Sequence, residues 1–479
     1  MKIYEHKIEL KCSDASEVFA KLRSKYSKSF LLESKDVSNI YGRLSLIGVD
    51  PALEIIGKNN EVKLSALNER GEIYLSLLGY HAGPEIRIVV EKDLGEAEES
   101  ERTKRKNITI VIRELLEKFA QEKKCLMGLY GAFSYDFVRL FEDLPELLDD
   151  DGVADFRLCL YDNFIFFDHL KERAKVVTYR MDGLEAHKAA LDLEDATKNE
   201  AEALSYKISG AEFDLDKESY EKLVENAKDL ARRGELFEVV YSNTLRAKFE
   251  GDPFALYQKY RLANPSPYLF FYDFADEQLV GASPEMMVRY ENGIVNMRPI
   301  SGTAKRGKDP IEDHENMLKL LANEKERSEL DMLIDLGRND LARICEPGIE
   351  ISDYRFVEKY SKVMHTVAHL SGRLKKGFKA LDALIACMNA GTLTGAPKVA
   401  AMTEIEKNET SRRGYYGGAV GYLSFSGEMD TGIIIRTAHI HGKDLSMRAG
   451  ATLLYDSDPE AEYQETLNKA EAFLTTFAA

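Results

Sequence analysis

The feature that most constrains the fold is a series of short apolar runs with no helix between them. From residue 267 to residue 303 the chain contains PYLFFYDF, EQLVGAS, MVRYENG and IVNMRPISGT. Runs of this length and composition predict strands joined as hairpins. Parallel strands would need a crossover connection, usually a helix, between each pair. The pattern therefore predicts an α+β fold with two large, mainly antiparallel sheets flanked by helices.

Other segments add strands and helices to this prediction. Residues 41–90 contain RLSLIGVDP, ALEIIGK, NEVKLSAL and EIYLSLL, which we predict to be strands. Helical spacing predicts helices at 108–124, 313–337 and 459–477. The mixed-charge segment 91–107 is predicted to be a solvated, mobile connection.

A change of composition near the middle suggests two regions. Residues 183–218 predict a helix rich in Ala, Glu and Lys, followed by an acidic loop. We place a domain boundary near 205–215, which separates an N-terminal region at 1–205 from a C-terminal domain at 212–479.

Charge and cysteine content exclude several classes of protein. Against 65 Lys and Arg stand 82 Asp and Glu, a net charge of −17, which disfavours nucleic acid or an anionic membrane as a general partner. No apolar stretch approaches the roughly 20 residues of a membrane-spanning helix, and the N-terminus does not resemble a signal peptide. The 5 cysteines form no CxxC pair, which favours a reducing cytoplasm and argues against a cysteine zinc site.

Two predicted helices each carry a pair of glutamates one turn apart. Glu462, Glu465 and Lys469 lie at i, i+3 and i+7, and at about 100° per residue they share one face. Glu326 and Glu329 repeat the spacing on the preceding long helix. Such pairs can hold Mg²⁺ when substrate and water complete its coordination, with Lys469 near an anionic group. Such pairs are more commonly part of a solvated charged face, and both interpretations stay open at this point.

Several familiar catalytic motifs are absent. GTLTGAPK at 391–398 precedes a helix but does not match the phosphate loop GxxxxGK[ST]. HTVAH at 365–369 lacks the glutamate of HExxH, so a zinc hydrolase is not indicated. No GxSxG occurs, and no cysteine lies in a nucleophile context. The sequence therefore gives no support to covalent hydrolase chemistry.

A series of longer motifs resembles the anthranilate synthase component I family of chorismate-utilising enzymes, over almost the whole chain. Each string alone is weak, but nearly a dozen in one order are specific. They are LLES (31–34), YGAFSYD (130–136), NPSPYLFF (264–271), VGASPE (280–285), PISGT (299–303), LIDLGRNDLARICEPG (333–348), KYSKVMH (359–365), GTLTGAPK (391–398), YYGGAVGY (415–422), IIIRT (433–437) and RAGATLLYDSDPEAEYQETLNKA (448–470).

The resemblance implies roles for named residues. Glu329 and Glu465 would be Mg²⁺ ligands, supported by Glu326 and Glu462, and the metal would hold the ring carboxylate of chorismate. The pyruvyl carboxylate would be held by Tyr416, Arg436 and the backbone at Gly450, Ala451 and Thr452. Gly302 and Thr303 would line the ring, and Lys469 would lie close to substrate and metal. The catalytic residues would be Glu285 as acid for the departing 4-hydroxyl, Thr392 near the reacting carbons, and His365 in the elimination of pyruvate.

Two positions of the sequence indicate which nucleophile the resemblance implies. Aminodeoxychorismate synthases typically carry a lysine where this chain has Ser301, and isochorismate and salicylate synthases carry one where it has Glu238. The resemblance therefore implies ammonia as nucleophile, with amination at C2 and loss of pyruvate giving anthranilate. The alternatives are an enzyme that stops at 2-amino-2-deoxyisochorismate, an aminodeoxychorismate synthase, or a non-catalytic tryptophan-binding regulator.

Three residues depart from the common family pattern. Many members have Gln in place of Glu238, a Gly in place of Thr452, and some have Cys in place of Gly432, in a region linked to inhibitor response. These departures leave open the details of pyruvyl contact and whether elimination follows amination.

The resemblance also implies a regulator and a protein partner. Tryptophan, as feedback inhibitor, would bind at Ser34, Pro267, Tyr268 and Leu269, which gives region 1–205 a regulatory role beside the chorismate-binding domain at 212–479. Since the chain ends directly after its last predicted helix and no cysteine lies in an amidotransferase context, we expect a separate glutamine amidotransferase subunit, component II, to supply ammonia.

Overall fold

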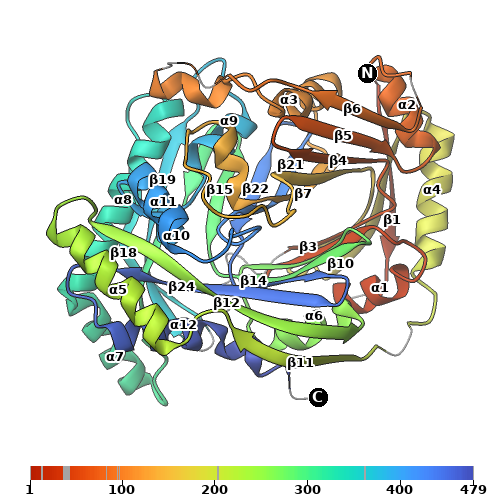
Figure 1. Cartoon of the computed structure of the whole chain (residues 1–479). Coiled ribbons are helices and arrows are strands. Elements are labelled where there is room, and N and C mark those ends of the chain that lie inside the picture. The colour runs from red at the N-terminus through yellow and green to blue at the C-terminus, as the bar shows by residue number, and fades with distance from the viewer. Residues whose placement is uncertain are drawn as a thin grey trace.

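The computed structural model describes residues 2–11, 14–35, 44–81, 83–93, 95, 98–201, 204–360 and 363–477. Within these ranges the strands form two 12-stranded sheets that face each other across the molecule, with helices around the periphery (Figure 1). Successive neighbours in both sheets pair antiparallel. The predicted α+β fold with two large antiparallel sheets is confirmed.

The first sheet combines strands from the beginning, middle and end of the chain. In spatial order it contains β1 (Tyr4–Leu10), β10 (Arg173–Arg180), β9 (Asn163–Asp168), β3 (Leu44–Val49), β2 (Ser29–Glu33), β13 (Tyr268–Asp273), β14 (Glu277–Ser283), β23 (Thr437–His441), β24 (Asp444–Leu453), β12 (Glu238–Gly251) and β11 (Tyr206–Phe213), with the short β20 (Gly395–Ala396) also paired to β12.

The second sheet is mixed in the same way. Its spatial order is β17 (Ile300–Lys305), β19 (Val363–Arg373), β16 (Ile294–Met297), β15 (Met286–Glu291), β22 (Met429–Ile433), β21 (Ala419–Ser424), β7 (Gly128–Phe133), β8 (Phe156–Tyr161), β4 (Leu53–Lys58), β5 (Glu61–Ala66) and β6 (Glu85–Val89), with β18 (Glu350–Lys359) paired to β19.

Helices cover the outer faces and connect the strands. They are α1 (Ala15–Leu22), α2 (Glu69–Leu77), α3 (Thr109–Lys118), α4 (Gly183–Ala196), α5 (Lys217–Arg232), α6 (Pro253–Ala263), α7 (Pro310–Ala322), α8 (Glu324–Ile344), α9 (Ala380–Cys387), α10 (Gly391–Thr394), α11 (Lys398–Asn408) and α12 (Pro459–Leu474), together with the 3₁₀ turns η1 (Glu99–Lys104) and η2 (Tyr135–Leu140). No helix in the described ranges has the length and apolar character needed to cross a membrane.

Two predictions from local patterns are wrong because side chains cap helices. EIYLSLL, predicted to be a strand, lies in and directly after α2, whose first turn is capped by Asn68 accepting from the Gly71 amide at 3.2 Å. The single helix predicted at 313–337 is two helices, α7 and α8. Asn323 separates them and caps α8, since its side chain accepts from the amides of Lys325 and Glu326.

The connections are also more ordered than the sequence suggested. The predicted acidic loop and boundary near 205–215 contain β11, whose residues pair with β12, so this segment is part of a sheet. In the predicted mobile connection 91–107, η1 forms and Asn107 is buried, donating to the Leu140 carbonyl oxygen at 3.0 Å; residues 94, 96 and 97 lie outside the described ranges. The division at 205–212 stays a prediction, but strands from both sides of it share both sheets.

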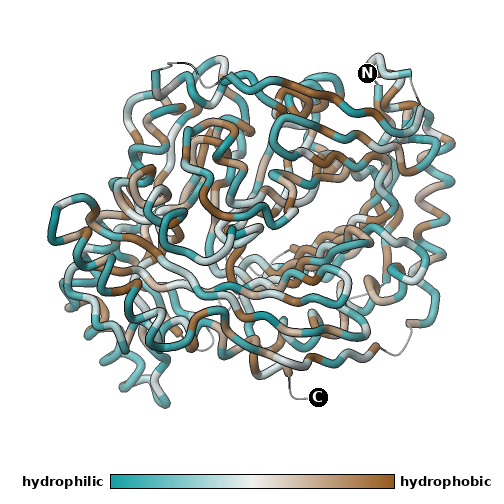
Figure 2. Tube along the Cα trace, in the orientation of Figure 1, coloured by the Kyte–Doolittle hydropathy of each residue, from teal (hydrophilic) through white to brown (hydrophobic). Residues whose placement is uncertain are grey.

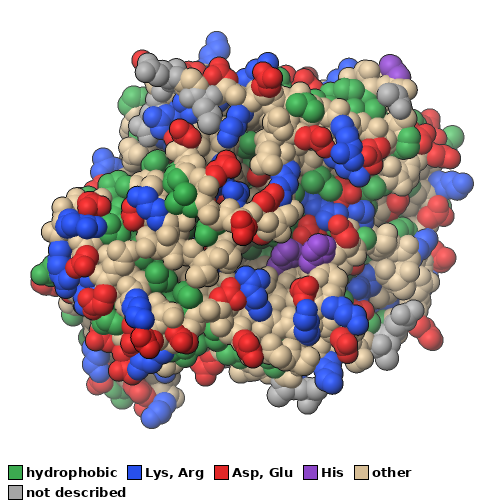
Figure 3. All heavy atoms as spheres, in the orientation of Figure 1, with side chains coloured by type: hydrophobic (Ala, Val, Ile, Leu, Met, Phe, Trp, Pro, Cys, Tyr) green, Lys and Arg blue, Asp and Glu red, His purple; other side chains and the backbone are tan. Residues whose placement is uncertain are grey.

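The main hydrophobic core lies between the sheets. Phe30 of β2 stacks on Tyr130 of β7 with ring centroids 4.7 Å apart, so the two inner faces are in direct contact. A second cluster lies between the outer face of the first sheet and helices α1, α4 and α6. Hydrophobic positions accordingly follow the interior strands in Figure 2, whereas acidic and basic side chains intermingle on the face shown in Figure 3.

Candidate functional site

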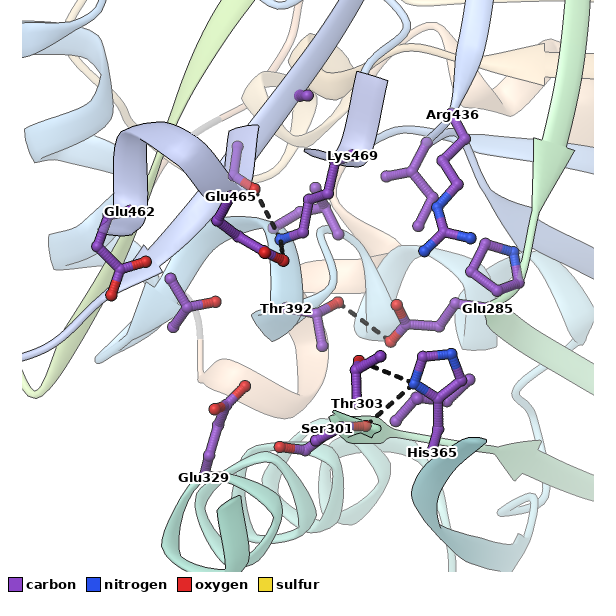
Figure 4. A pocket seen from close by; sticks show the side chains of 18 of the residues that line it. Glu285, Ser301, Thr303, Glu329, His365, Thr392, Arg436, Glu462, Glu465 and Lys469 are labelled. Carbon is purple, nitrogen blue, oxygen red and sulfur yellow. Dashed lines mark hydrogen bonds and ion pairs between the residues drawn. The ribbon is translucent and has the colours of Figure 1, made fainter. Parts of the chain in front are cut away.

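A cavity of about 360 Å³ takes side chains from both sheets and from α8, α10 and α12. Figure 4 shows Glu329, Glu462 and Glu465 on one side of the cavity and Arg436, Glu285 and His365 on the other. All of the predicted catalytic, substrate and metal residues except Ala451 line it. We call it the acidic cavity, and its predicted members are Glu285, Gly302, Thr303, Glu326, Glu329, His365, Thr392, Tyr416, Arg436, Gly450, Thr452, Glu462, Glu465 and Lys469.

Ala451 is excluded from the cavity wall by the strand period. Successive side chains of a strand point to opposite faces, and Gly450 and Thr452 line the cavity. Ala451 is fully buried on the other face, in a cluster with Val239 and Tyr241. Any contact of Ala451 with a ligand is therefore through its backbone, which is the contact that the resemblance implied.

The four predicted metal-site glutamates come from two helices at one side of the cavity. The cap at Asn323 fixes the start of α8, and Asp458 caps α12 by accepting from the Ala461 amide at 2.9 Å. Burial and the charge of Glu326 raise the pKa of Glu329. Burial, and next the charge of Glu465, likewise raise the pKa of Glu326. These carboxylates repel one another, and a bound cation would relieve that repulsion.

Two cations face the carboxylates with different degrees of pairing. Lys469 donates from Nζ to the Gly450 carbonyl oxygen at 2.8 Å and lies 3.6 Å from Glu465. The Arg436 guanidinium has no hydrogen bond or ion pair with any residue that the structure describes. Its backbone, at φ 49°, is held by Tyr260 and Ala282, which both donate to its carbonyl oxygen at 3.1 Å. The guanidinium is thus positioned and free to bind an anion.

The hydrogen bonds of His365 define its tautomer. HTVAH lies in strand β19, and Nδ1 of His365 is 3.0 Å from both the Gly302 carbonyl oxygen and the Thr303 hydroxyl. Because a carbonyl oxygen only accepts, Nδ1 carries the hydrogen and Nε2 keeps its lone pair. Burial and the nearby charge of Arg436 lower the pKa of His365 to about 4. The imidazole is therefore neutral near pH 7 and can accept a proton at Nε2.

Glu285 is the proton donor of the cavity, whereas His365 is a proton acceptor. Its carboxylate oxygen accepts from the Thr392 hydroxyl at 3.1 Å, as Figure 4 shows. Burial raises the pKa of Glu285 to about 8, despite the hydrogen bond from Thr392 and the charges of Lys469 and Arg436. The group is thus protonated near neutral pH and can donate a proton. One cavity holds an acid and a base with well-separated pKa values, which suits proton transfer in both directions.

Sequence reasoning missed two cations of the cavity wall. Lys325 lies beside the glutamate pair of α8, in a charged run that is typical of solvated helix faces. Arg448 is buried and bound to Glu409 at 2.8 Å, in a strand where no local pattern marks it. Of the departures, Thr452 lines the cavity, while Glu238 is buried without lining it.

A second cavity, of about 420 Å³, gathers the predicted inhibitor residues Ser34, Pro267, Tyr268 and Leu269. The Tyr268 hydroxyl donates to Asp430 at 3.0 Å, and Arg289 binds the same carboxylate at 2.7 Å. Gly432 lies under the tyrosine, since a Cβ there would be 2.8 Å from Cγ of Tyr268. We call it the aromatic cavity; its wall also includes Leu46, Lys124, Tyr130, Phe166, Phe270, Tyr290, Glu291, Val420, Tyr422 and Glu428.

Comparison with known proteins identifies the family. A family model described as chorismate binding enzyme matches residues 64–475. The chain belongs to the chorismate-binding enzymes. The match extends across the predicted boundary near 205–215, so the chorismate-binding enzyme fold uses strands from both halves.

Named relatives within this family are similar along most of their length. The chain is 35% identical to anthranilate synthase component 1 of Aquifex aeolicus, over 95% of this chain and 90% of that protein. It matches the structure of anthranilate synthase component I from Streptococcus pneumoniae with a TM-score of 0.71 and 32% identity, over 91% and 93% of the two chains. The menaquinone-specific isochorismate synthase of Escherichia coli gives the same TM-score at 18% identity, over 99% and 95%, and shares the fold.

Proposed function

We propose that the protein is the large subunit of an anthranilate synthase, a lyase that converts chorismate and ammonia to anthranilate and pyruvate in tryptophan biosynthesis. The observation that carries the proposal is the acidic cavity, where a protonated Glu285 and a neutral His365 face the guanidinium of Arg436, which has no partner among the described residues. The relatives named anthranilate synthase component 1 support the same reaction.

Chorismate is a dicarboxylate, and the cavity offers separate binding groups for its two ends. Arg436 and Tyr416 would bind the pyruvyl carboxylate together with the backbone at Gly450 and Thr452. Gly302 can approach the ring closely because it lacks a side chain; its φ of 67° also suits glycine. Lys469 adds positive charge between the two ends.

The glutamates fit a Mg²⁺ ion. In the part of the chain that the structure describes, no three His, Cys, Asp or Glu side chains converge closely enough to hold a metal alone. Mg²⁺ commonly takes one or two carboxylates and completes its shell with water and substrate, so Glu329 and Glu465, supported by Glu326 and Glu462, suffice. When bound, the ion would supply positive charge for the ring carboxylate.

Glu285 as acid and His365 as base would act in two successive steps of the reaction. Glu285 gives its proton to the 4-hydroxyl group, so the C4–O bond breaks with release of water while ammonia forms a bond to C2. His365 accepts the C2 proton at Nε2, the C3–O bond breaks as the ring becomes aromatic, and the departing enolpyruvate takes up one proton to become pyruvate. Thr392 holds the carboxyl group of Glu285 in place for the first step.

The remaining parts of the proposal concern partners and regulation. Only unprotonated ammonia is nucleophilic, and at neutral pH most of it is protonated to ammonium. A separate glutamine amidotransferase subunit would therefore supply ammonia. Tryptophan would bind in the aromatic cavity, whose aromatic wall matches an indole. We propose a cytoplasmic location, which the cysteine usage supports.

One assay tests the proposal directly. Purified chain is incubated with chorismate, Mg²⁺ and ammonium sulfate at pH 8.5, and anthranilate fluorescence and pyruvate are measured together. Equal amounts of both products are expected, with glutamine inactive in place of ammonium. An aminated product without pyruvate would favour a 2-amino-2-deoxyisochorismate or aminodeoxychorismate synthase, and no turnover would favour a tryptophan-binding regulator.

A further inference from the structure

The backbone of Arg436 has a conformation that its neighbours must hold. Its φ of 49° lies in the left-handed region, which few residues other than glycine adopt, and such a conformation persists only where surrounding contacts fix it. Two groups bind its carbonyl oxygen, the hydroxyl of Tyr260 and the amide of Ala282, each at 3.1 Å. The position of the guanidinium in the acidic cavity therefore depends on these two donors.

Tyr260, in helix α6, is itself fixed on several sides. Its side chain is buried, and its ring packs edge-on against Phe473 of α12, with ring centroids 5.3 Å apart. The hydroxyl accepts from the side-chain amide of Asn264 at 3.4 Å while it donates to the Arg436 carbonyl oxygen. The hydroxyl is thus held in one orientation, toward the backbone of Arg436.

The same helix is bound to the wall of the aromatic cavity. Arg261, the next residue after Tyr260, binds the carboxylate of Glu33 at 2.6 Å. The Tyr257 hydroxyl donates to the same carboxylate at 2.7 Å, and all of these side chains are buried. Glu33 ends β2 directly before Ser34, which lines the aromatic cavity. A ligand that displaces the end of β2 therefore acts on α6 through buried, charge-assisted hydrogen bonds.

The second donor to Arg436, the amide of Ala282, is attached to the aromatic cavity as well. Ala282 of β14 pairs with Leu269 of β13, which lines that cavity. The Ala282 carbonyl oxygen accepts from the Ser266 hydroxyl at 3.2 Å, and the Ser266 carbonyl oxygen accepts from the Lys35 amide at 3.1 Å. Both groups that hold the Arg436 backbone are therefore connected to the wall of the aromatic cavity.

We propose that Tyr260 positions Arg436 for the substrate carboxylate, and that α6 carries the occupancy of the aromatic cavity to it. The inference rests on the proposed function and adds the route by which the two cavities communicate. Tyr260 is a positioning residue, since it acts through Arg436 and does not itself line the acidic cavity. An aromatic ligand that shifts the end of β2 moves Arg261 and with it Tyr260, so the guanidinium leaves the place where it binds chorismate. Coupling between two ligands is reciprocal, so chorismate weakens binding of the aromatic ligand by the same factor.

Tyr260→Phe tests the positioning role, because it removes one hydroxyl group and keeps the ring. With chorismate, Mg²⁺ and ammonium, we expect KM for chorismate to rise about 3- to 10-fold, the effect of one lost hydrogen bond, while kcat and KM for ammonia change less than about twofold. Tyr206→Phe is the matched control: that hydroxyl also donates to a backbone carbonyl oxygen, of Thr476 at 2.6 Å, and Tyr206 lines neither cavity. In an Arg436→Gln background, Tyr260→Phe should add less than about a twofold change, because both substitutions remove one interaction.

Tryptophan is the probe of the coupling. Its dissociation constant is measured from the fluorescence of the added indole, and its effect on KM for chorismate from initial rates. Tyr260→Phe should bind tryptophan with a dissociation constant within about twofold of the parent value. At tryptophan about ten times above that constant, the factor by which KM for chorismate rises should fall at least about threefold. Tyr257→Phe loosens α6 from Glu33 and leaves the bond to Arg436 in place, so it should reduce the same factor without changing KM in the absence of tryptophan.

Several outcomes would overturn the proposal. Unchanged KM and full inhibition in Tyr260→Phe would show that the coupling follows the chain from Asp430 in β22 to Arg436. Equal losses in kcat, or a full additional effect in the Arg436→Gln background, would show that Tyr260 is merely structural. If Tyr260→Phe does not fold, Tyr257→Phe decides, and unchanged inhibition there would overturn the proposal.

Failure of the proposed function would look different. A parent that forms no anthranilate from chorismate and ammonium would refute that function itself. A parent that forms anthranilate and is not inhibited by tryptophan would overturn the coupling and leave the proposed reaction intact.

Discussion

The acidic and aromatic cavities have similar volumes, about 360 and 420 Å³, and both take side chains from the two sheets. They differ in how their charges are paired. In the aromatic cavity Asp430 is bound by Arg289 and Tyr268, and Lys124 bridges Glu291 and Glu428. In the acidic cavity Arg436 has no partner among the described residues, and burial together with a neighbouring glutamate raises the pKa of Glu326 and of Glu329.

The difference shows how one fold separates binding from chemistry. A cavity whose charges are already neutralised offers apolar surface and a few oriented polar groups, which suits an uncharged aromatic body. A cavity with unneutralised charges destabilises the ligand-free protein. When a charged substrate and a metal ion bind, each charge gains a partner. The experiments that follow test this contrast, from the largest expected effect to the smallest.

Removing divalent cations should affect only the acidic cavity. Excess chelator is expected to lower anthranilate formation at least 1000-fold, with recovery on adding Mg²⁺, because the carboxylates then lack the charge that joins them to the substrate. Tryptophan binding should persist. Because the chain contains no tryptophan, the fluorescence of the added indole has no background from protein tryptophan. Loss of both anthranilate formation and tryptophan binding would show that the two cavities do not function separately.

Glu285→Gln removes the proton donor while keeping the side-chain volume. We expect kcat for amination of chorismate to fall about 100- to 1000-fold, the range of general acid catalysis. Stopped-flow and steady-state assays at fixed free ammonia should also show that the parent loses activity as pH rises through about 8, where Glu285 ionises. A parent profile that is flat from pH 7 to pH 9 would remove Glu285 from this role.

Arg436→Gln tests whether the guanidinium of Arg436 binds substrate. KM for chorismate should rise about 10- to 100-fold, since a charge-assisted hydrogen bond is worth about 1.5–3 kcal/mol and each 1.4 kcal/mol is tenfold. Arg246→Gln is the matched control, because that arginine is exposed and already paired with Asp214. Equal effects of the two substitutions would show that net charge, and not position, is responsible.

Ser34→Leu addresses the aromatic cavity alone. The larger side chain occupies space beside Pro267 and Tyr268, so the tryptophan concentration that halves activity should rise about tenfold, with uninhibited turnover kept. Ser76→Leu, at an exposed position of α2, controls for added apolar surface. If both variants keep the parent's sensitivity, Ser34 is not part of an inhibitor site.

The weakest expected effect is on stability. The folded-state pKa of Glu285 is raised to about 8, so its contribution to stability is complete below about pH 4.5 and is lost as pH rises through about 8. Glu285→Gln should therefore reduce the fall in melting temperature between pH 5 and pH 8.5 by about 4 °C. Calorimetry measures this, with Glu250→Gln, at an exposed glutamate of β12, as control; an unchanged fall would show that Glu285 ionises normally when folded.

Local patterns marked only the glutamate pairs of the candidate site, and the family resemblance supplied its other residues. The i, i+3 spacing found both glutamate pairs, because each pair is fixed within one helix turn. That α8 and α12 meet depends on sheet pairing between residues far apart, which no local pattern records. Lys325 was missed for the opposite reason, since its charged neighbours make a functional residue resemble a solvated face.

The errors in secondary structure have equally specific causes. EIYLSLL contains residues common in strands, but one hydrogen bond from Gly71 to Asn68 starts a helix there. The acidic segment near 205–215 has the composition of a loop, yet β12 provides a neighbouring strand that pairs with it. In both cases contacts with residues outside the segment itself decided the structure.

The interleaving of the sheets has a consequence for biosynthesis. When residues 1–205 have left the ribosome, β2 and β7 still lack their neighbours β13 and β21, which are made much later. Both strands therefore present an open hydrogen-bonding edge during translation, and such edges pair readily with other chains. The N-terminal half cannot complete either sheet alone, so protection of the nascent chain until residue 453 has emerged becomes a condition for obtaining the enzyme.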